Sequence, residues 1–466
     1  MIEIPRLIVG GTQSGVGKSS VTLALVAALR QRNLRVQTFK VGPDYLDPSH
    51  LSRASGRPCY NLDGWMSDKG YVNRLFARTC ADADIAIIEG VMGLFDGGSA
   101  NSLQGSTAQI ADWLQAPVLL VVNAHGMARS IAAMVQGYTN FEPTVNIGGI
   151  IANMCGSASH GQWLEQALEA AQLPPLLGAI PREALPTLPS RHLGLVSGEE
   201  TDWNEAMFAD LSNSASEYID LEKLIDQAKL APKLGSAVAE PAVAADSGLR
   251  LAVAYDSAFQ FYYQDLFDAL EQRGVELCFF SPLQDDCLPP GSDALYLGGG
   301  YPEVHIESLS GNGLMLRSVC DFCLSGRPVY AECGGLMYLS QGVEESDQQW
   351  PLTGVLPCWS RMLPKRKALG YVEANLQGST LFGDKGTTLR GHEFHYSELC
   401  SNPISVDGWQ SLYQLKQNRS GKCRAEGYQK GNVLASYAHL YLAAHRHAID
   451  TFIGRIRSTK RQLQHG

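Results

Sequence analysis

The sequence predicts an α/β protein of two domains, the first built on a doubly wound parallel sheet. Three observations predict this. Short apolar segments alternate with helical stretches in both halves, a change in composition separates the halves, and 466 residues are too many for one hydrophobic core. We expect a first domain over residues 1–225, a linker over 226–248, a second domain over 249–455 and a C-terminal tail over 456–466.

Short apolar runs separated by helices are typical of parallel strands that are buried on both faces. The first half contains five predicted strands, at Leu7–Val9, Val36–Phe39, Ile85–Ile88, Val118–Val122 and Ile147–Ile151. Residues Ser19–Arg30 are predicted to form the helix after the first strand.

The segment 226–248 is rich in Ala, Pro, Gly and Ser and has neither strand alternation nor a sustained helical face, which predicts a linker. A new alternation follows it. The second half contains a predicted helix, Gln264–Arg273, and predicted strands at Leu251–Tyr255, Leu277–Phe280, Ala294–Leu297 and Pro328–Ala331. The basic residues near the C-terminus are interpreted as a solvated helix face.

Composition and charge narrow the class of protein. The net charge of −10 argues against a nucleic-acid partner, because such a surface must neutralise phosphates. The first residues lack the pattern of a signal peptide, and no apolar run approaches the roughly 20 residues of a membrane helix. We therefore expect a cytoplasmic protein with no membrane partner.

A glycine-rich segment follows the first predicted strand, where residues 10–20 read GGTQSGVGKSS. Glycines let backbone N–H groups turn toward an anion, and the following helix adds its positive N-terminal end. We predict that Lys18 reaches the outer phosphates of ATP and that Ser19 ligates Mg²⁺. The nucleotide-binding residues predicted here are Gly11, Thr12, Gly15, Val16, Gly17, Lys18, Ser19 and Ser20. The pattern departs from the usual one, since Thr12 stands where the first glycine is expected.

Acidic residues follow two other predicted strands. Glu89 ends the strand Ile85–Ile88, and Asp44 and Asp47 lie just beyond Val36–Phe39. Nucleotides bind at the carboxyl edge of such sheets, and Mg²⁺ prefers carboxylates together with phosphate oxygens and water. We predict Ser19, Asp47 and Glu89 as metal ligands, while each aspartate taken singly also fits ordinary turn chemistry.

The second domain contains a candidate nucleophile, Cys333, in the sequence YAECGGL. It lies between a predicted strand and a helix, and the glycines after it permit a sharp turn that exposes the thiol. A helix N-terminus is also expected to lower the thiol pKa. Gly299, Gly300 and Gly334 are predicted to provide backbone N–H groups for an oxyanion, and His439 is the predicted base.

This domain resembles the class I glutamine amidotransferases, whose usual triad has a glutamate two places after the histidine. Tyr441 stands there instead. The resemblance is therefore to the branch of that class that acts in cobalamin synthesis with a Cys–His pair. Glu393 or a backbone carbonyl remains as a candidate to orient His439.

Nine segments in both domains resemble the cobyrinate a,c-diamide synthase family. They are GGTQSGVGKSS, KVGPDYLDPSHL, NLDGWM, EGVMGLFDG, GMARS, LPSRHLGLV, YLGGGYPE, AECGGLMYL and RGHEFHYS. The phosphate loop itself is similar to that of dethiobiotin synthetase, which implies a P-loop NTPase-like first domain. The resemblance implies a corrinoid substrate, ATP and L-glutamine, with Asp44, Tyr45 and Leu46 at the substrate. It departs at Asn123, where Asp is expected.

The two domains together predict one reaction. ATP would phosphorylate a substrate carboxylate, and ammonia from glutamine would displace phosphate to give an amide. By resemblance these are the a- and c-acetates of cobyrinate. The same amidation of hydrogenobyrinate or nickel sirohydrochlorin remains an alternative, and a homodimer is a further expectation. Arg53, Arg57, Arg129 and Arg191 are candidate partners for those carboxylates, or ordinary surface residues.

Other functions fit the sequence less well. Cobyric acid synthase should lack the GPDYLDP loop, and CTP synthase should carry the complete triad. A partitioning ATPase would leave Cys333 without a role.

Overall fold

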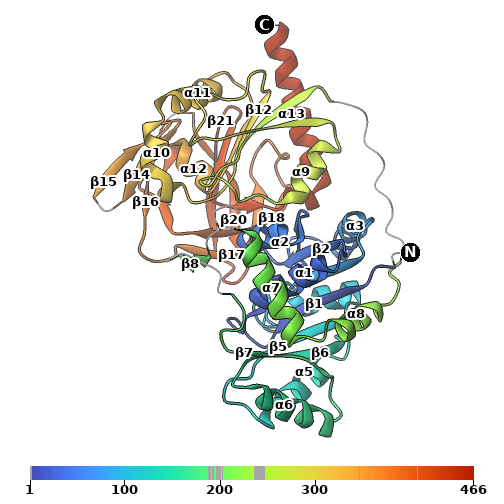
Figure 1. Cartoon of the computed structure of the whole chain (residues 1–466). Coiled ribbons are helices and arrows are strands. Elements are labelled where there is room, and N and C mark those ends of the chain that lie inside the picture. Colours follow the sequence, from blue (N-terminus) through green and yellow to red (C-terminus); the bar gives the residue numbers. More distant parts are fainter. Residues whose placement is uncertain are drawn as a thin grey trace. The chain divides into compact units, whose positions relative to one another are not determined.

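The computed structural model describes residues 3–186, 190–191, 194–195, 201, 203–235, 247–345, 347–406 and 408–465. The chain divides into two compact units, Met1–Glu240 and Pro241–Gly466 (Figure 1). Of the expected linker, residues 236–246 lie outside the described part. Residues 226–229 belong to a helix, so the linker cannot begin at Asp226.

Unit 1 contains a seven-stranded sheet in the order β3-β2-β4-β1-β5-β6-β7, and its neighbouring strands all run parallel. The strands are β1 (Arg6–Gly11), β2 (Val36–Val41), β3 (Tyr60–Leu62), β4 (Ile85–Glu89), β5 (Val118–Asn123), β6 (Ile147–Cys155) and β7 (Leu176–Pro181). The five predicted strands are confirmed. The edge strands β3 and β7 were not predicted, nor was a further short pair, β8 (Ser190–Arg191) and β9 (Gly194–Leu195).

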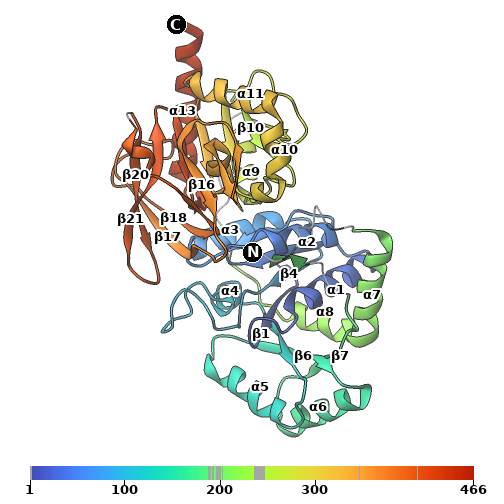
Figure 2. The ribbon, with the colours of Figure 1, turned by 90° about the vertical axis from the view of Figure 1, so that its left-hand side faces the viewer.

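Helices cover both faces of this sheet (Figure 2). One core packs α1 (Lys18–Gln31), α2 (Leu46–Ser55), α7 (Glu205–Tyr218) and α8 (Leu221–Lys229) against one face. A second core packs four more helices against the opposite face: α3 (Lys69–Thr79), α4 (Thr107–Leu114), α5 (Ser130–Phe141) and α6 (Ala158–Ala170). Burial on both faces explains why the strands are apolar throughout instead of alternating.

Unit 2 contains a ten-stranded mixed sheet in the order β11-β10-β12-β13-β22-β21-β20-β17-β18-β23. Its parallel half consists of β10 (Leu249–Ala254), β11 (Val275–Phe280), β12 (Ala294–Leu297), β13 (Val329–Glu332) and β22 (Val433–Ser436). Its antiparallel half consists of β17 (Ala368–Leu376), β18 (Thr388–His395), β20 (Gln410–Gln417), β21 (Cys423–Lys430) and β23 (His439–Leu440). The four strands predicted from the sequence are confirmed, and all lie in the parallel half.

A smaller sheet, in the order β15-β14-β16-β19, completes the strands of unit 2. These are β14 (Ser340–Glu345), β15 (Gln348–Pro351), β16 (Leu356–Met362) and β19 (Ser397–Leu399). One core joins it to the large sheet and to α10 (Ile306–Gly311), α11 (Gly313–Leu324) and α12 (Gly334–Leu339).

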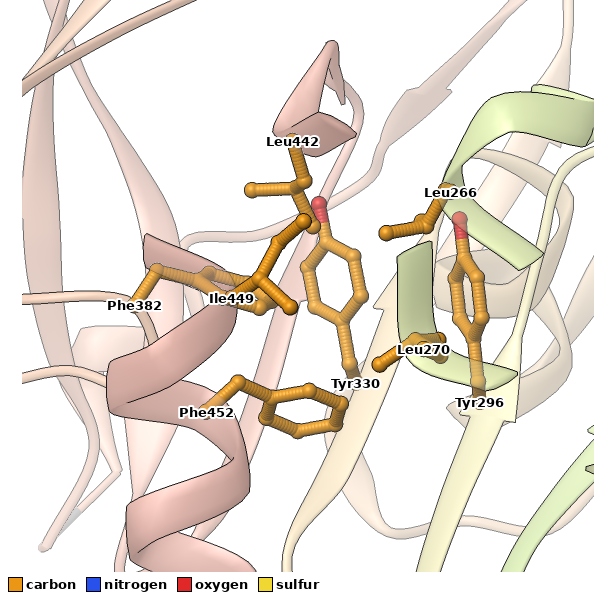
Figure 3. Close-up of a pocket in the computed structure, with 8 residues that line it drawn as sticks. All are labelled: Leu266, Leu270, Tyr296, Tyr330, Phe382, Leu442, Ile449 and Phe452. Carbon is orange, nitrogen blue, oxygen red and sulfur yellow. The ribbon is translucent and has the colours of Figure 1, made fainter. Parts of the chain in front are cut away.

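Aromatic and aliphatic side chains from α9 (Gln264–Glu271) and α13 (Arg446–His465) meet side chains of β12 and β13 around a small apolar cavity (Figure 3). Helix α13 runs on to His465, so the expected tail over 456–466 is helical through His465. Short 3-10 turns lie at Pro302–His305, Pro403–Ser405 and Leu442–Ala444. Within the described ranges, no helix is both long and apolar enough to cross a membrane.

Candidate nucleotide and glutaminase sites

The predicted phosphate loop connects β1 to α1, and all eight predicted nucleotide-binding residues lie in this loop or at its two ends. Gly15 and Gly17 adopt the left-handed conformation, with φ of 78° and 94°. A Cβ atom on Gly17 would lie 2.2 Å from Asn153 Nδ2, which donates a hydrogen bond to Val16 O at 2.8 Å. Asn153 thus ties the loop to the end of β6, and only glycine fits at position 17.

The side chain of Lys18 lies within this loop. Its Nζ donates to Gln13 O at 3.3 Å and to Met92 O at 2.5 Å. Burial, together with Lys40, lowers the pKa of Lys18 from its ordinary value. Backbone carbonyls alone satisfy an ammonium group less well than anionic oxygens do, so the arrangement suits an incoming phosphate.

The predicted metal ligands Ser19, Asp47 and Glu89 meet around Lys40. Ser19 Oγ lies 2.7 Å from Glu89 Oε1 and 3.5 Å from Asp47 Oδ1. Lys40 Nζ donates to Glu89 Oε1 at 2.7 Å and also pairs with Asp47. Burial would lower the pKa of Lys40, but the carboxylates of Asp47 and Glu89 outweigh it and raise that pKa.

The donor set fits Mg²⁺, which binds through one or two carboxylates plus phosphate oxygens and water. Glu89 is fully buried, and in the part of the chain that the structure describes its Oε2 has no hydrogen-bond partner. Burial and the neighbouring Asp47 raise the pKa of Glu89 to about 7. A buried carboxylate oxygen that lacks a partner is costly unless a ligand satisfies it.

Asp44 lies in the turn just before helix α2. Its Oδ1 accepts hydrogen bonds from the backbone N–H groups of Leu46 at 2.9 Å and Asp47 at 3.0 Å. Burial and Asp47 raise the pKa of Asp44 to about 6. The side chain therefore acts in the turn itself, which was the alternative for this residue. The substrate role of Asp44, Tyr45 and Leu46 stays a prediction.

Arg57 and Asn123 have local partners in unit 1. Arg57 pairs with Asp82, with Nη2 2.6 Å from Oδ1, so this guanidinium already has a carboxylate. Asn123 Oδ1 accepts a hydrogen bond from His125 N at 3.0 Å. The side chain of Arg191 lies outside the described residues.

Cys333 occupies a strained turn between β13 and α12. Its backbone has φ 48° and ψ −99°, a conformation that costs energy for a residue with a side chain. Its N–H donates to Ser436 O at 2.8 Å. A Cβ atom on Gly335 would lie 2.2 Å from Leu297 O, so the turn needs glycine there. The turn has the geometry expected of a nucleophile elbow.

The expected lowering of the thiol pKa of Cys333 is wrong for this structure. Burial raises that pKa, the nearby carboxyl of Glu303 adds to the increase, and the N–H of Gly334 opposes it. Helix α12 has only six residues and Cys333 is 6% exposed, so desolvation of the thiolate outweighs the helix N-terminus.

His439 lies against the glycine run Gly298–Gly300. A Cβ atom on Gly299 would lie 2.4 Å from His439 Cε1 and 3.3 Å from its Nε2. A Cβ atom on Gly334 would lie 3.2 Å from Gly300 N. The glycine run thus contacts both the His439 ring and the start of α12, where Cys333 lies. The predicted catalytic and oxyanion residues of unit 2 are therefore neighbours in space.

Glu393, the candidate to orient His439, and Tyr441, at the position of the usual triad glutamate, both have other partners. Glu393 pairs with Arg424 and lies 3.8 Å from His395 Nε2. Tyr441 Oη donates to Asp265 Oδ2 at 2.6 Å. The carboxylate beside the His439 ring is that of Glu332, whose Oε2 lies 3.7 Å from Nδ1.

Two charged residues at these sites were not predicted from the sequence. Lys40 and Glu332 were both within quoted motifs, but neither was assigned a role. Both are buried charged residues at the end of a strand; Glu332 directly precedes Cys333, and Lys40 lies four residues before Asp44. That position was the one feature of the sequence that indicated them.

Comparison with known proteins assigns a family to each unit. Residues 7–196 match the profile of the CobQ/CobB/MinD/ParA nucleotide binding domain, and residues 250–447 match that of the CobB/CobQ-like glutamine amidotransferase domain. A cobyrinate a,c-diamide synthase from Syntrophotalea carbinolica is 52% identical, over 97% of this chain and 98% of that protein.

Relatives from other organisms carry the same name. Cobyrinate a,c-diamide synthases from Leptospira interrogans and Dehalococcoides mccartyi are 43% and 40% identical, each over 97% of this chain and 98% of the relative. The match covers both units of the chain, with its phosphate loop and its cysteine elbow. The chain is a member of the cobyrinate a,c-diamide synthase family of glutamine-dependent ligases.

Proposed function

We propose that this ligase converts the a- and c-acetate carboxylates of cobyrinate into amides, using ATP and ammonia from glutamine. The observation that carries the proposal is the presence in one chain of a phosphate loop with paired carboxylates and of a strained cysteine beside a histidine. The name of the relatives supports the choice of cobyrinate.

In the glutaminase half, Cys333 Sγ would attack the side-chain amide carbon of glutamine. His439 would take the thiol proton and return it to the departing ammonia, and water would then hydrolyse the glutamyl thioester. Backbone N–H groups of Gly299, Gly300 and Gly334 would stabilise the oxyanion that forms in each step. The N–H of Gly334 lies at the Cys333 thiol, where it opposes the rise in the thiol pKa, and this supports the role of Gly334.

In the synthetase half, Lys18 and the loop N–H groups would bind the phosphates of ATP. The substrate carboxylate would attack the γ-phosphorus, ADP would leave, and ammonia would then displace phosphate from the acyl phosphate. Ser19, Asp47 and Glu89 would hold Mg²⁺, and the unpartnered Glu89 Oε2 supports that assignment. When bound, Mg²⁺ supplies positive charge that offsets the charge on the phosphate oxygens.

Cys333→Ala tests the division of labour. We expect glutamine-dependent amidation to be abolished and amidation with ammonium chloride to be retained, because the synthetase half does not use the thiol. Cys323→Ala is a matched control, since Cys323 is another buried cysteine of unit 2, on α11. Loss of both activities in a folded Cys333→Ala protein would exclude a scheme with two separate sites.

Mass spectrometry of the products identifies the macrocycle. Cobyrinate, hydrogenobyrinate and nickel sirohydrochlorin would each be supplied with glutamine and MgATP. Each conversion of an acid to an amide replaces OH by NH₂ and lowers the mass by about one unit. We expect two successive decreases in product mass with cobyrinate, and either no decrease or a slower one with the other two rings. Turnover confined to another ring would overturn the proposed substrate.

A further inference from the structure

We infer that Glu332, the residue before the nucleophile, positions His439 and so replaces the glutamate that is absent at position 441. The inference deepens the proposed function, because it assumes that Cys333 and His439 are the catalytic pair. Glu332 is thus a positioning residue: its carboxylate lies beside the histidine, and it acts on the reaction through His439.

The carboxylate of Glu332 is held by three donors. Tyr296 Oη donates to Oε2 at 2.9 Å, Leu440 N donates to Oε1 at 3.0 Å, and Tyr330 Oη also donates to Oε1. Glu332 is 2% exposed. An ionised carboxylate only accepts hydrogen bonds, so three donors around it match that form and fix its orientation.

The two tyrosines are themselves rigidly placed. Their rings stack at 5.3 Å between centroids, and Figure 3 shows both hydroxyl oxygens directed the same way from β12 and β13. Leu266, Leu270 and Phe452 line the same small apolar cavity as the two rings. A packed support of this kind keeps the rotamer of Glu332 fixed, as a positioning group requires.

Glu332 contacts the histidine segment at two points. Its Oε1 accepts the backbone N–H of Leu440, the residue after His439, and its Oε2 faces His439 Nδ1 at 3.7 Å. This separation lies within the range of an ion pair with a protonated imidazole. A proton held on Nδ1 leaves Nε2 as the basic nitrogen.

His392 and Tyr441 do not supply a negative charge at His439. His392 stacks on the ring with centroids 5.0 Å apart, and burial, with His439 beside it, lowers the pKa of His392 well below its ordinary value. Tyr263 Oη pairs with His392 Nδ1 at 3.1 Å. Since His392 is therefore neutral and Tyr441 bonds to Asp265, Glu332 is the anion placed to stabilise an imidazolium at His439.

The test compares Glu332→Gln with the matched variant Glu426→Gln. Glu426 is also 2% exposed and accepts a backbone N–H, that of Tyr437, at 2.9 Å, but it does not face His439. We expect Glu332→Gln to lower kcat for glutamine hydrolysis by about 100-fold or more, with KM for glutamine changed little. Glu426→Gln should keep kcat for glutamine hydrolysis within about threefold of the wild-type value. The rate of ammonia-dependent amidation should also stay within about threefold of wild type in both variants.

A double-mutant cycle separates positioning from general damage to unit 2. The readout is the rate at which iodoacetamide alkylates Cys333, followed by mass spectrometry of its peptide. Glu332→Gln should slow this reaction in the wild-type background and have no further effect on a His439→Ala protein, because its action passes through His439.

The inference is overturned if Glu332→Gln keeps kcat within about threefold of wild type, or if it slows alkylation equally without His439. Either result leaves the proposed function intact as long as Cys333→Ala abolishes glutamine-dependent amidation. If Cys333→Ala retains that activity, the proposed function itself fails.

Discussion

Adding one methyl group at Gly299 tests whether the His439 ring must lie where the structure places it. In Gly299→Ala the new Cβ atom would lie 2.4 Å from His439 Cε1. Carbon atoms in contact prefer separations of about 3.5–4.0 Å, so the ring or the glycine run must move by roughly 1 Å. A displacement of about that size at a catalytic group costs on the order of 10²-fold in rate.

The assay measures glutamate release from glutamine and, separately, amidation with ammonium chloride. We expect Gly299→Ala to lower kcat for glutamate release by roughly 10²-fold and to leave ammonia-dependent amidation unchanged, because the clash is confined to unit 2. Gly313→Ala, at the start of α11, is the control, since a Cβ atom there meets nothing within 4 Å. If both variants hydrolyse glutamine at the wild-type rate, the placement of His439 is not what limits catalysis.

Two further predictions concern the synthetase half and stability. Lys18→Ala should abolish amidation from glutamine and from ammonia alike, while glutamine hydrolysis persists. Amidation at the wild-type rate in this variant would show that the phosphate loop takes no part in the reaction. Phe382→Ala should lower the free energy of unfolding by about 3–5 kcal/mol in urea titrations, because the fully buried ring packs on Tyr330 at 4.6 Å and lines an existing cavity. The 78% exposed Leu324 gives a control, since Leu324→Ala should change stability by less than about 0.5 kcal/mol; equal losses in the two variants would contradict the reasoning.

The parallel strands of both units were predictable because each is a short apolar run between helices. Val118–Val122 and Ala294–Leu297 are buried on both faces, so their sequences are continuously hydrophobic. The antiparallel half of unit 2 has no such pattern. Strand β20 alternates exposed and buried residues only in part, and β21 begins with three exposed ones, so neither is distinct from a loop in sequence.

Chain segments near the predicted boundaries were also decided by packing. Residues 226–229 continue α8, whose Leu221, Leu224 and Ala228 are buried in unit 1. The C-terminal helix α13 extends to His465, with Ile456 and Thr459 still buried. Composition predicted the linker at residue 226, because small residues dominate that segment, while the basic C-terminal residues were interpreted as a helix face, as the structure has them.

The sequence by itself determined the phosphate loop, the cysteine elbow and the order of the two domains, because each depends on residues adjacent along the chain. Tertiary structure alone decided that Lys40 joins Asp47 to Glu89 and that Glu332 faces His439. Glu332 and His439 are separated by more than a hundred residues and lie on different strands. Their contact depends on which strands become neighbours in the sheet, and burial of apolar side chains along the whole domain sets that order.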